Sequence, residues 1–184
     1  MDGPHFMRAR RRDTRRQGGV TAIELLIAVA VLAVLVSLGA PSYRDFQTRM
    51  RLASSMSDLG SDLLLARSDS IRRNSRMLVC PRASASATTC ATSVTGETWM
   101  NGWLVCYDTD ADGACDTGSA SDPNPVRVRG SPTSPLTLTG PAATVIFFPV
   151  GSANGTSTFT MTGGTSASRS TKVAPSGAVT SSKT

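Results

Sequence analysis

The sequence has almost no histidine and no closely spaced pair of cysteines. Its 184 residues include one histidine, His5, and four cysteines, none of them in a CxxC pair. Because structural zinc sites take their ligands from histidines and from cysteines at short spacing, a zinc site is disfavoured. The abundant serines have no base for nucleophilic catalysis, and Gly163-Gly164 lacks the lysine that follows in a phosphate-binding loop. We therefore expect no enzyme activity.

The net charge is also small beyond the first nineteen positions. The formal net charge is +6, and residues 1–19 contribute +4 of it, from six arginines against Asp2 and Asp13. Only about +2 remains for the rest of the chain. Positive charges that flank a first apolar segment stay on the cytoplasmic side of a membrane. The pI near 9.8 therefore does not by itself indicate a nucleic-acid partner.

Residues 1–19 lack the apolar core and the small-residue cleavage site of a conventional secretory signal. We interpret them as a processing leader that lies outside the fold. Residues 20–41 follow as an apolar run long enough to cross a hydrocarbon core. The run contains one acid, Glu24, close to its start. An ionisable side chain in such a segment is unfavourable, so its presence indicates a function that an ordinary signal anchor would not need.

The residues around this acid carry a family resemblance. Residues 19–26, GVTAIELL, resemble the type IV prepilin motif, in which a glycine and an aromatic residue precede T-L-I-E-L-L. The resemblance implies that a prepilin peptidase cleaves between Gly19 and Val20 and methylates the new amino terminus, although Val20 replaces the usual phenylalanine. It also implies that Pro41 bends or opens the helix locally. Glu24 would pair with the amino-terminal ammonium of a neighbouring subunit and set the register between subunits.

Beyond Pro41, residues 42–75 continue the helix in amphipathic form. Apolar residues recur there at steps of three or four, and the helix is expected to end near residues 72–75. We expect the apolar stripe to pack on a sheet, with a coiled-coil seam as the alternative. The predicted stripe comprises Phe46, Met50, Ala53, Met56, Leu59, Leu63 and Ala66.

Residues 76–184 form the expected β domain. They contain short runs with β propensity, and Asn154-Gly155 predicts a hairpin between two of them. The fold class is therefore α+β, with the long N-terminal helix packed on an antiparallel sheet or β-sandwich. The expected strands cover 77–80, 126–129, 136–139, 145–148, 156–161 and 172–179. The aromatic residues expected in the core are Trp99, Trp103, Phe147, Phe148 and Phe159.

Two further stretches narrow the resemblance. Residues 64–81, LLARSDSIRRNSRMLVCP, and 99–108, WMNGWLVCYD, are similar to corresponding stretches of the GspH/FimT subgroup of type IV pilin-like proteins. This implies a minor pilin that initiates or decorates pili, serving pilus biogenesis, twitching motility or DNA uptake; the alternative is a type II secretion pseudopilin. The implied partners are other minor and major pilins, met through the N-terminal helix, the prepilin peptidase and an inner-membrane assembly platform. The implied location is a single pass through the inner membrane with the β domain in the periplasm, followed by incorporation into a pilus or pseudopilus.

All four cysteines follow the apolar helix, on the side that the charge rule places outside the cytoplasm. Two disulfides are therefore expected there, with three pairings open. The nearest-neighbour pairing, Cys80 with Cys90 and Cys106 with Cys115, closes short loops and is the one we prefer.

Four acids from the end of the 99–108 segment onward resemble the start of a calcium loop, because oxygen ligands at alternate positions precede a glycine. They are Asp108, Asp110, Asp112 and Asp116. The position of the bidentate glutamate of an EF-hand is Ser119, and no flanking helices are expected. We favour a polar turn over calcium, and we expect no other cofactor.

The subgroup resemblance also raises DNA as a partner. FimT-like minor pilins are implicated in capturing DNA through arginines in a carboxy-terminal G-R-x-R segment. The matching glycine is Gly177, but Ala178 and Thr180 stand at the arginine positions. The remaining candidates for phosphate contacts are Arg169, Lys172, Lys183, Arg127 and Arg129.

Overall fold

The structure, a computed structural model, describes residues 19–164 and 167–183. The chain divides into two compact units, Met1–Pro41 and Ser42–Thr184. One helix, α1 (Ala22–Arg73), belongs to both. Residues 1–18, most of the predicted leader, lie outside the described residues.

In the first unit, α1 begins at a sequence-encoded cap. The hydroxyl of Thr21 accepts a hydrogen bond from the amide of Glu24 at 3.3 Å, in the T-x-x-E order of a capping box. The large apolar side chains from Val20 to Val36 are all more than half exposed. Within the described part of the chain, no single helix has the length and hydropathy of a membrane span, but Ala22–Ser37 and Ser42–Arg73 pass that test when taken together.

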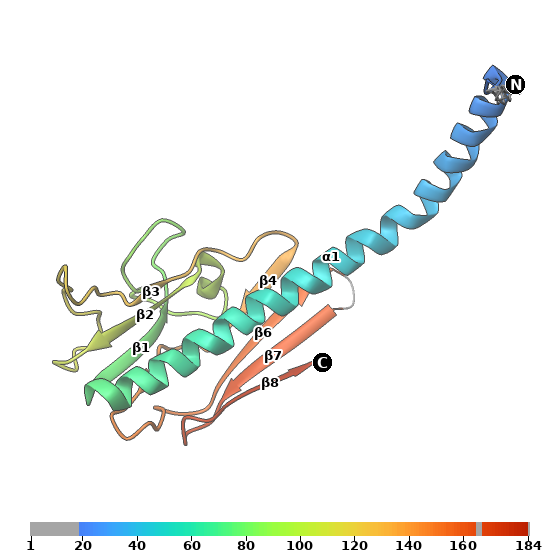
Figure 1. Ribbon diagram of the computed structural model, residues 1–184. Coiled ribbons are helices and arrows are strands. Elements are labelled where there is room, and N and C mark those ends of the chain that lie inside the picture. Colours follow the sequence, from blue (N-terminus) through green and yellow to red (C-terminus); the bar gives the residue numbers. More distant parts are fainter. Residues whose placement is uncertain (1–18, 165–166, 184) are drawn as a thin grey trace, which may run out of the picture. The chain divides into compact units, whose positions relative to one another are not determined.

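In the second unit, α1 packs against two antiparallel sheets (Figure 1), so the predicted α+β class is confirmed. One sheet has the strand order β3-β2-β1-β5 and the other β4-β6-β7-β8. The elements are β1 (Arg76–Pro81), the 3-10 helix η1 (Thr98–Asn101), β2 (Trp103–Asp108), β3 (Arg127–Val128), β4 (Leu136–Thr139), β5 (Val145–Phe147), β6 (Ser157–Gly163), β7 (Ala167–Val173) and β8 (Val179–Lys183).

The buried face of α1 differs from the predicted stripe at its beginning. Phe46 and Met50 are 60% and 57% exposed, whereas Leu52, absent from the prediction, is buried. Neighbouring positions on a helix differ by about 100°, so two stripes one position apart share the same spacing of three and four. Periodicity alone does not distinguish them. The buried face consists of Leu52, Met56, Leu59, Leu63 and Ala66.

Four of the five aromatic residues that the sequence analysis placed in the core are buried. The rings of Trp99 and Phe159 meet edge to face, with centroids 4.7 Å apart. The indole N–H of Trp99 donates to the carbonyl of Pro141 at 2.8 Å, which satisfies the one polar atom of that buried ring. Phe148, the fifth predicted core residue, is only half-buried. The four buried aromatics are Trp99, Trp103, Phe147 and Phe159.

The face of β1 and β2 that points away from the core is also buried. Leu78 and Leu104 lie there, fully buried, beside two of the cysteines. The disulfides join Cys80 to Cys90 and Cys106 to Cys115, the pairing preferred from sequence. The sulfurs of Cys90 and Cys115 are 3.4 Å apart. The two bonded loops therefore meet over this face, which explains why β1 reads as a continuous apolar run.

The predicted strand 172–179 is wrong, because it contains a turn. β7 ends at Val173 and β8 begins at Val179, and the two strands pair antiparallel. The amide of Ala174 donates to the carbonyl of Ala178 at 2.9 Å. Gly177 adopts φ +76°, a conformation that glycine accepts without steric penalty.

The predicted hairpin at Asn154-Gly155 is also wrong. β5 pairs with β1, whereas β6 pairs with β4 and β7, so the chain passes from one sheet to the other at this point. Asn154 instead binds the edge of β5. Its side chain accepts from the amide of Ile146 at 3.0 Å and donates to the carbonyl of Thr144 at 3.1 Å.

Candidate assembly and binding surfaces

The predicted processing and assembly residues begin the first unit. Gly19, Val20 and Glu24 are exposed. Glu24 lies in the first turn of α1, where the positive end of the helix dipole favours a carboxylate. It forms no ion pair with any residue that the structure describes. Cleavage, methylation, the pairing of Glu24 and the role of Pro41 stay predictions.

Arg129, one of the predicted phosphate ligands, is engaged inside the second unit. Its Nε lies 2.8 Å from the Asp62 carboxylate, and an Nη lies 3.6 Å from Asp58. The hydrogen bond to Asp62 raises the pKa of Arg129, against the opposing effect of burial. Two aspartates thus already neutralise this guanidinium, which leaves little charge for an external phosphate.

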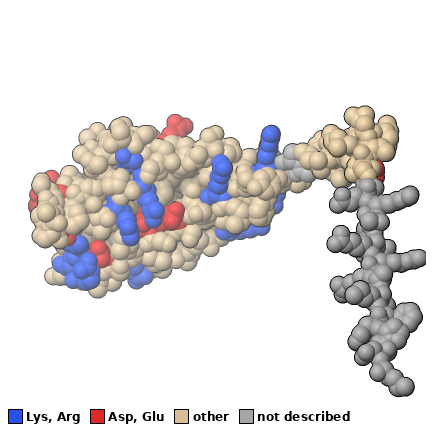
Figure 2. All heavy atoms as spheres, turned by 45° about the horizontal axis from the view of Figure 1, so that its top comes forward, with Lys and Arg blue, Asp and Glu red and all other residues tan. Residues whose placement is uncertain are grey.

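The other four candidates lie at separate places. Arg169 on β7 faces Lys183 on β8. Lys172 points to the opposite face of the same sheet, since strand residues alternate between faces. Arg127 lies on β3, in the other sheet. In Figure 2, the Lys and Arg side chains of the drawn face are spread over the second unit rather than joined in one surface. Of the five, the structure pairs only Arg169 with Lys183.

A groove of about 310 Å³ lies between α1 and the β7–β8 edge of the second sheet. Its helix side carries small residues, and Gly60 brings the helix close to β8: a Cβ on Gly60 would lie 3.8 Å from the Ser181 hydroxyl. The lining residues are Ala53, Met56, Ser57, Gly60, Ser61, Leu64, Arg169, Ser181 and Ser182.

Gly177, the glycine matched to the DNA-binding segment, has a packing role. A Cβ at this position would lie 1.9 Å from the carbonyl oxygen of Gly151. Arg67 of α1 donates to that same oxygen at 3.0 Å and to the carbonyl of Ser176 at 3.2 Å. The turn therefore anchors the β7–β8 hairpin to the helix, and this accounts for a glycine there without reference to DNA.

Asp108, the first acid of the predicted calcium loop, is fully buried. Its carboxylate accepts from the amides of Asp112 and Gly113 at 3.1 and 3.2 Å and lies 3.4 Å from Arg76. Burial raises the pKa of Asp108 above its ordinary value, although Arg76 and the amides oppose the shift.

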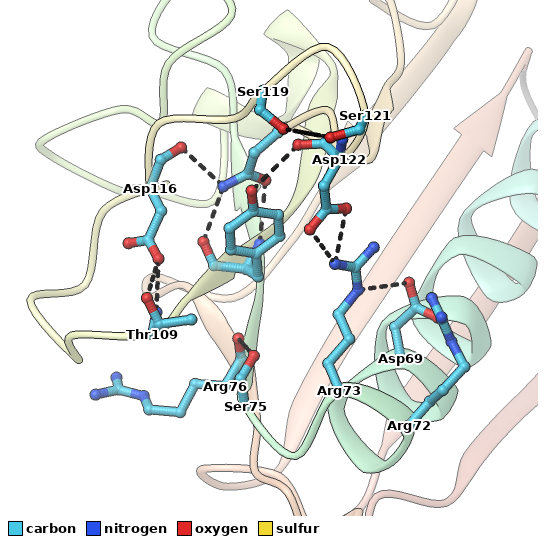
Figure 3. Close-up of polar contacts among 12 residues, drawn as sticks. Asp69, Arg72, Arg73, Ser75, Arg76, Thr109, Asp116, Ser119, Ser121 and Asp122 are labelled. Carbon is cyan, nitrogen blue, oxygen red and sulfur yellow. Dashed lines mark hydrogen bonds and ion pairs between the residues drawn. The ribbon is translucent and has the colours of Figure 1, made fainter.

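The other three acids also bind their own loop. Asp110 and Asp112 accept from the amides of Asp112 and Ala114 at 3.3 and 2.7 Å. Asp116 accepts from the amide and the hydroxyl of Thr109 (Figure 3). Oxygens of Asp108, Asp110 and Asp116 lie within 4.8 Å of one another, without Asp112. Calcium takes six to eight oxygens, so three carboxylates already hydrogen-bonded to the loop fit a polar turn better.

A charged cluster at the C-terminal end of α1 joins the helix to the loop that follows β2 (Figure 3). Arg73 donates to both carboxylate oxygens of Asp122 at 2.8 Å and lies 3.6 Å from Asp69. Its guanidinium also lies 5.2 Å from the ring centroid of Tyr107. The hydrogen bond to Asp122 raises the pKa of Arg73. Sequence reasoning missed this cluster, because residues 49 positions apart form it.

Asp62 is the most buried polar contact that sequence reasoning missed. Only 2% of this residue is exposed. One carboxylate oxygen accepts from the indole N–H of Trp103 at 3.0 Å and from Arg129 at 2.8 Å. A signal was present: Asp62 follows Leu59 by three positions and precedes Ala66 by four, within the apolar stripe.

Comparisons with known proteins found one family model and two similar crystal structures. The family model described as type II transport protein GspH matches residues 55–177. A crystal structure of the Pseudomonas aeruginosa (strain PAO1) type IV minor pilin FimU has a TM-score of 0.50 and 17% identity, over 73% of this chain and 90% of that chain. A second crystal form gives 0.48 and 16%, over 71% and 92%. No curated protein sequence matches the chain.

Proposed function

Because the chain belongs to the GspH family of pilin-like proteins, we propose that it is a minor subunit of a type IV pilus, which helps to initiate or decorate the filament. The observation that carries the role as a filament subunit, in a pilus or in the alternative machine below, is the exposed apolar helix from Val20 to Val36. Each Å² of apolar surface removed from water stabilises the buried state by about 25 cal/mol, so burial of this helix in an apolar environment is strongly favoured. A bilayer provides it before assembly, and neighbouring pilin helices provide it afterwards.

The partners follow from this change of surroundings. Prepilin peptidase would act at the exposed Gly19–Val20 bond, and an inner-membrane platform would transfer the helix from lipid to filament. Before transfer the chain would cross the inner membrane once, with residues 76–184 in the periplasm. Glu24 would then pair with the amino terminus of the next subunit, because a carboxylate among apolar helices needs a cation.

A second candidate is a minor pseudopilin of a type II secretion system. The matching family is described as a type II transport protein, which favours this candidate. Both machines would use the same helix, so the helix does not distinguish them.

Deleting the gene and scoring piliation, secretion and transformation in parallel tests the choice. We expect fewer pili with normal secretion. Loss of secretion with intact pili would favour the pseudopilin instead, and an unchanged phenotype in all three assays would contradict both.

Direct DNA binding, the third candidate, would rest on Arg169 and Lys183. Gel shifts of the purified chain test it across salt concentrations, because phosphate contacts weaken as salt rises. A shift that Arg169→Ala and Lys183→Ala together remove would support binding. No shift even at low salt would exclude it.

A further inference from the structure

The β7–β8 edge carries an unfavourable pair of cations. Arg169 and Lys183 are register partners on the same face of the sheet. Like charges directly opposite each other on neighbouring strands are destabilising. Neither side chain forms an ion pair within the described chain. A subunit that keeps two such cations together gains if an anionic group binds between them.

The groove beside this pair is lined mainly by small and polar residues. Arg169 lines it, no acid does, and the helix side offers Ala53, Ser57 and Gly60. β8 is the last strand of its sheet among the described strands, so its outer edge borders the groove without a partner strand. The missing complement is therefore an acidic segment.

The chain itself carries such a segment, the acidic tip, residues 110–113. Its sequence is Asp-Ala-Asp-Gly, and Ala111 stands at φ +65° between the two acids. All four residues are exposed. Among the described residues, Asp110 and Asp112 form no ion pair. Within the part of the chain that the structure describes, the tip thus presents two carboxylates without an ion-pair partner, and the groove edge presents two such cations.

The two features cannot meet within one subunit. The groove lies level with Gly60, which is close to Ser181. The tip lies beyond the end of α1 at Arg73, since Arg76 donates to the carbonyl of Ala111 at 3.1 Å. Thirteen residues of helix, at a rise of 1.5 Å each, separate these levels by about 20 Å. Contact between them requires a second copy.

We propose that the acidic tip of one copy docks in the groove of the next, with Asp110 and Asp112 facing Arg169 and Lys183. The methyl of Ala111 would meet the small residues of the helix. The contact is heterologous, so it does not form a symmetric pair. It rests on the proposed function only for its setting: exposed ion pairs are individually weak, and the membrane that holds the copies before assembly would align and concentrate them.

The native chain can report this contact, because Lys172 and Lys183 are its only two lysines. A water-soluble carbodiimide activates a carboxylate, and a touching lysine Nζ then displaces the urea to form an amide. Applied to the full chain in its membrane, it should produce a dimer whose linked peptides join Asp110 or Asp112 to Lys183. Mixing isotopically light and heavy chains shows that the bond is intermolecular.

Matched variants separate this contact from random collision. Lys183→Arg keeps the charge but removes the amine, so the product should disappear, whereas Lys172→Arg should leave it unchanged. Asp110→Asn with Asp112→Asn should lower the dimer yield about tenfold, as should 1 M salt, where charges are screened beyond about 3 Å. The exposed Asp45→Asn is the control acid.

Linkage through Lys172, a yield insensitive to salt and to the Asn variants, or no dimer would each overturn the contact. The outcome is independent of the deletion test. A chain required for pili that yields no Lys183 product refutes this contact alone. A Lys183 product from a chain whose deletion changes neither pili nor secretion refutes the proposed function alone.

Discussion

Asp62 shows how a single buried carboxylate can tie α1 to a sheet. Its oxygens receive hydrogen bonds from Trp103 of β2 and from Arg129, which follows β3. Asp58, one helical turn earlier, contacts the same guanidinium at 3.6 Å but with a side chain that is 49% exposed. The two acids have the same chemistry and share a partner, so burial is what separates them.

Replacing Asp62 with Ala should lower the free energy of unfolding by about 3 kcal/mol. The change leaves a buried indole N–H and an arginine without their acceptor. Asp58→Ala is the control and should change stability by less than about 1 kcal/mol, because exposed pairs contribute little. Denaturant unfolding of the full chain in detergent, followed by tryptophan fluorescence, measures both; equal losses would contradict this assignment.

Asp108 should make the free energy of unfolding decrease as the pH rises, which is opposite to the usual effect of an aspartate. Burial raises its pKa above the ordinary 3.8, so the folded chain holds the proton more tightly than the unfolded chain. Its stabilising contribution is therefore complete below that ordinary value and is lost as the pH rises through the folded-state pKa.

Asp108→Asn, which cannot titrate, isolates this effect. The free energy of unfolding of the native chain, minus that of the variant, should fall as the pH rises from acid toward neutral. Denaturant titrations at a series of pH values measure the difference. A difference that stays constant or rises would contradict the raised pKa.

At the scale of elements, the β7–β8 hairpin depends on its turn as much as on its strands. The turn packs against Gly151 and accepts a hydrogen bond from Arg67 of α1. Gly151 is followed closely in the chain by Asn154, where the chain changes from one sheet to the other. Both turns contain a glycine, but only one of them needs it. Gly177 has a positive φ and a neighbour in the way of a Cβ, while Gly155 has nothing within 4 Å.

Gly177→Ala should therefore lower the free energy of unfolding by about 2 kcal/mol or more, through backbone strain and a steric clash. Gly155→Ala should change it by less than about 0.5 kcal/mol. Thermal unfolding of the two variants side by side tests the contrast. Similar melting temperatures would show that the Gly177 turn shifts without penalty.

At the scale of the whole molecule, the two units are expected to divide the work. The first unit offers an apolar helix with one acid, and the second offers a folded domain with two disulfides. On the proposed function, the first unit brings subunits together and the second determines which surfaces meet. The two glutamates of the chain, Glu24 and Glu97, fall one in each unit.

Glu24→Ala should leave the chain processed and membrane-bound but reduce its share in sheared filaments about tenfold, through loss of an ion pair in apolar surroundings. Glu97→Ala, an exposed change in the second unit, is the control. Immunoblots of the sheared and membrane fractions measure the distribution. Normal incorporation of Glu24→Ala would count against the predicted pairing.

The sequence by itself determined what local pattern can determine. The three-and-four periodicity specifies the amphipathic half of α1, which ends at Arg73, within the predicted range 72–75, and the alternation of short runs and turns specifies β structure. Of the three pairings that the sequence left open, the one preferred for its short loops is the one in the structure. These features depend on residues close together in the chain, where propensity and spacing act directly.

Only the tertiary structure decided which residues begin the buried stripe of α1, that the chain changes sheets at Asn154, and that Asp62 binds Arg129. It also showed that Arg169 faces Lys183 while Lys172 points away. Such facts join residues far apart in the sequence. The packing of the sheets on the helix, and the burial of side chains from distant segments against each other, determine these contacts. A local sequence pattern does not contain that information.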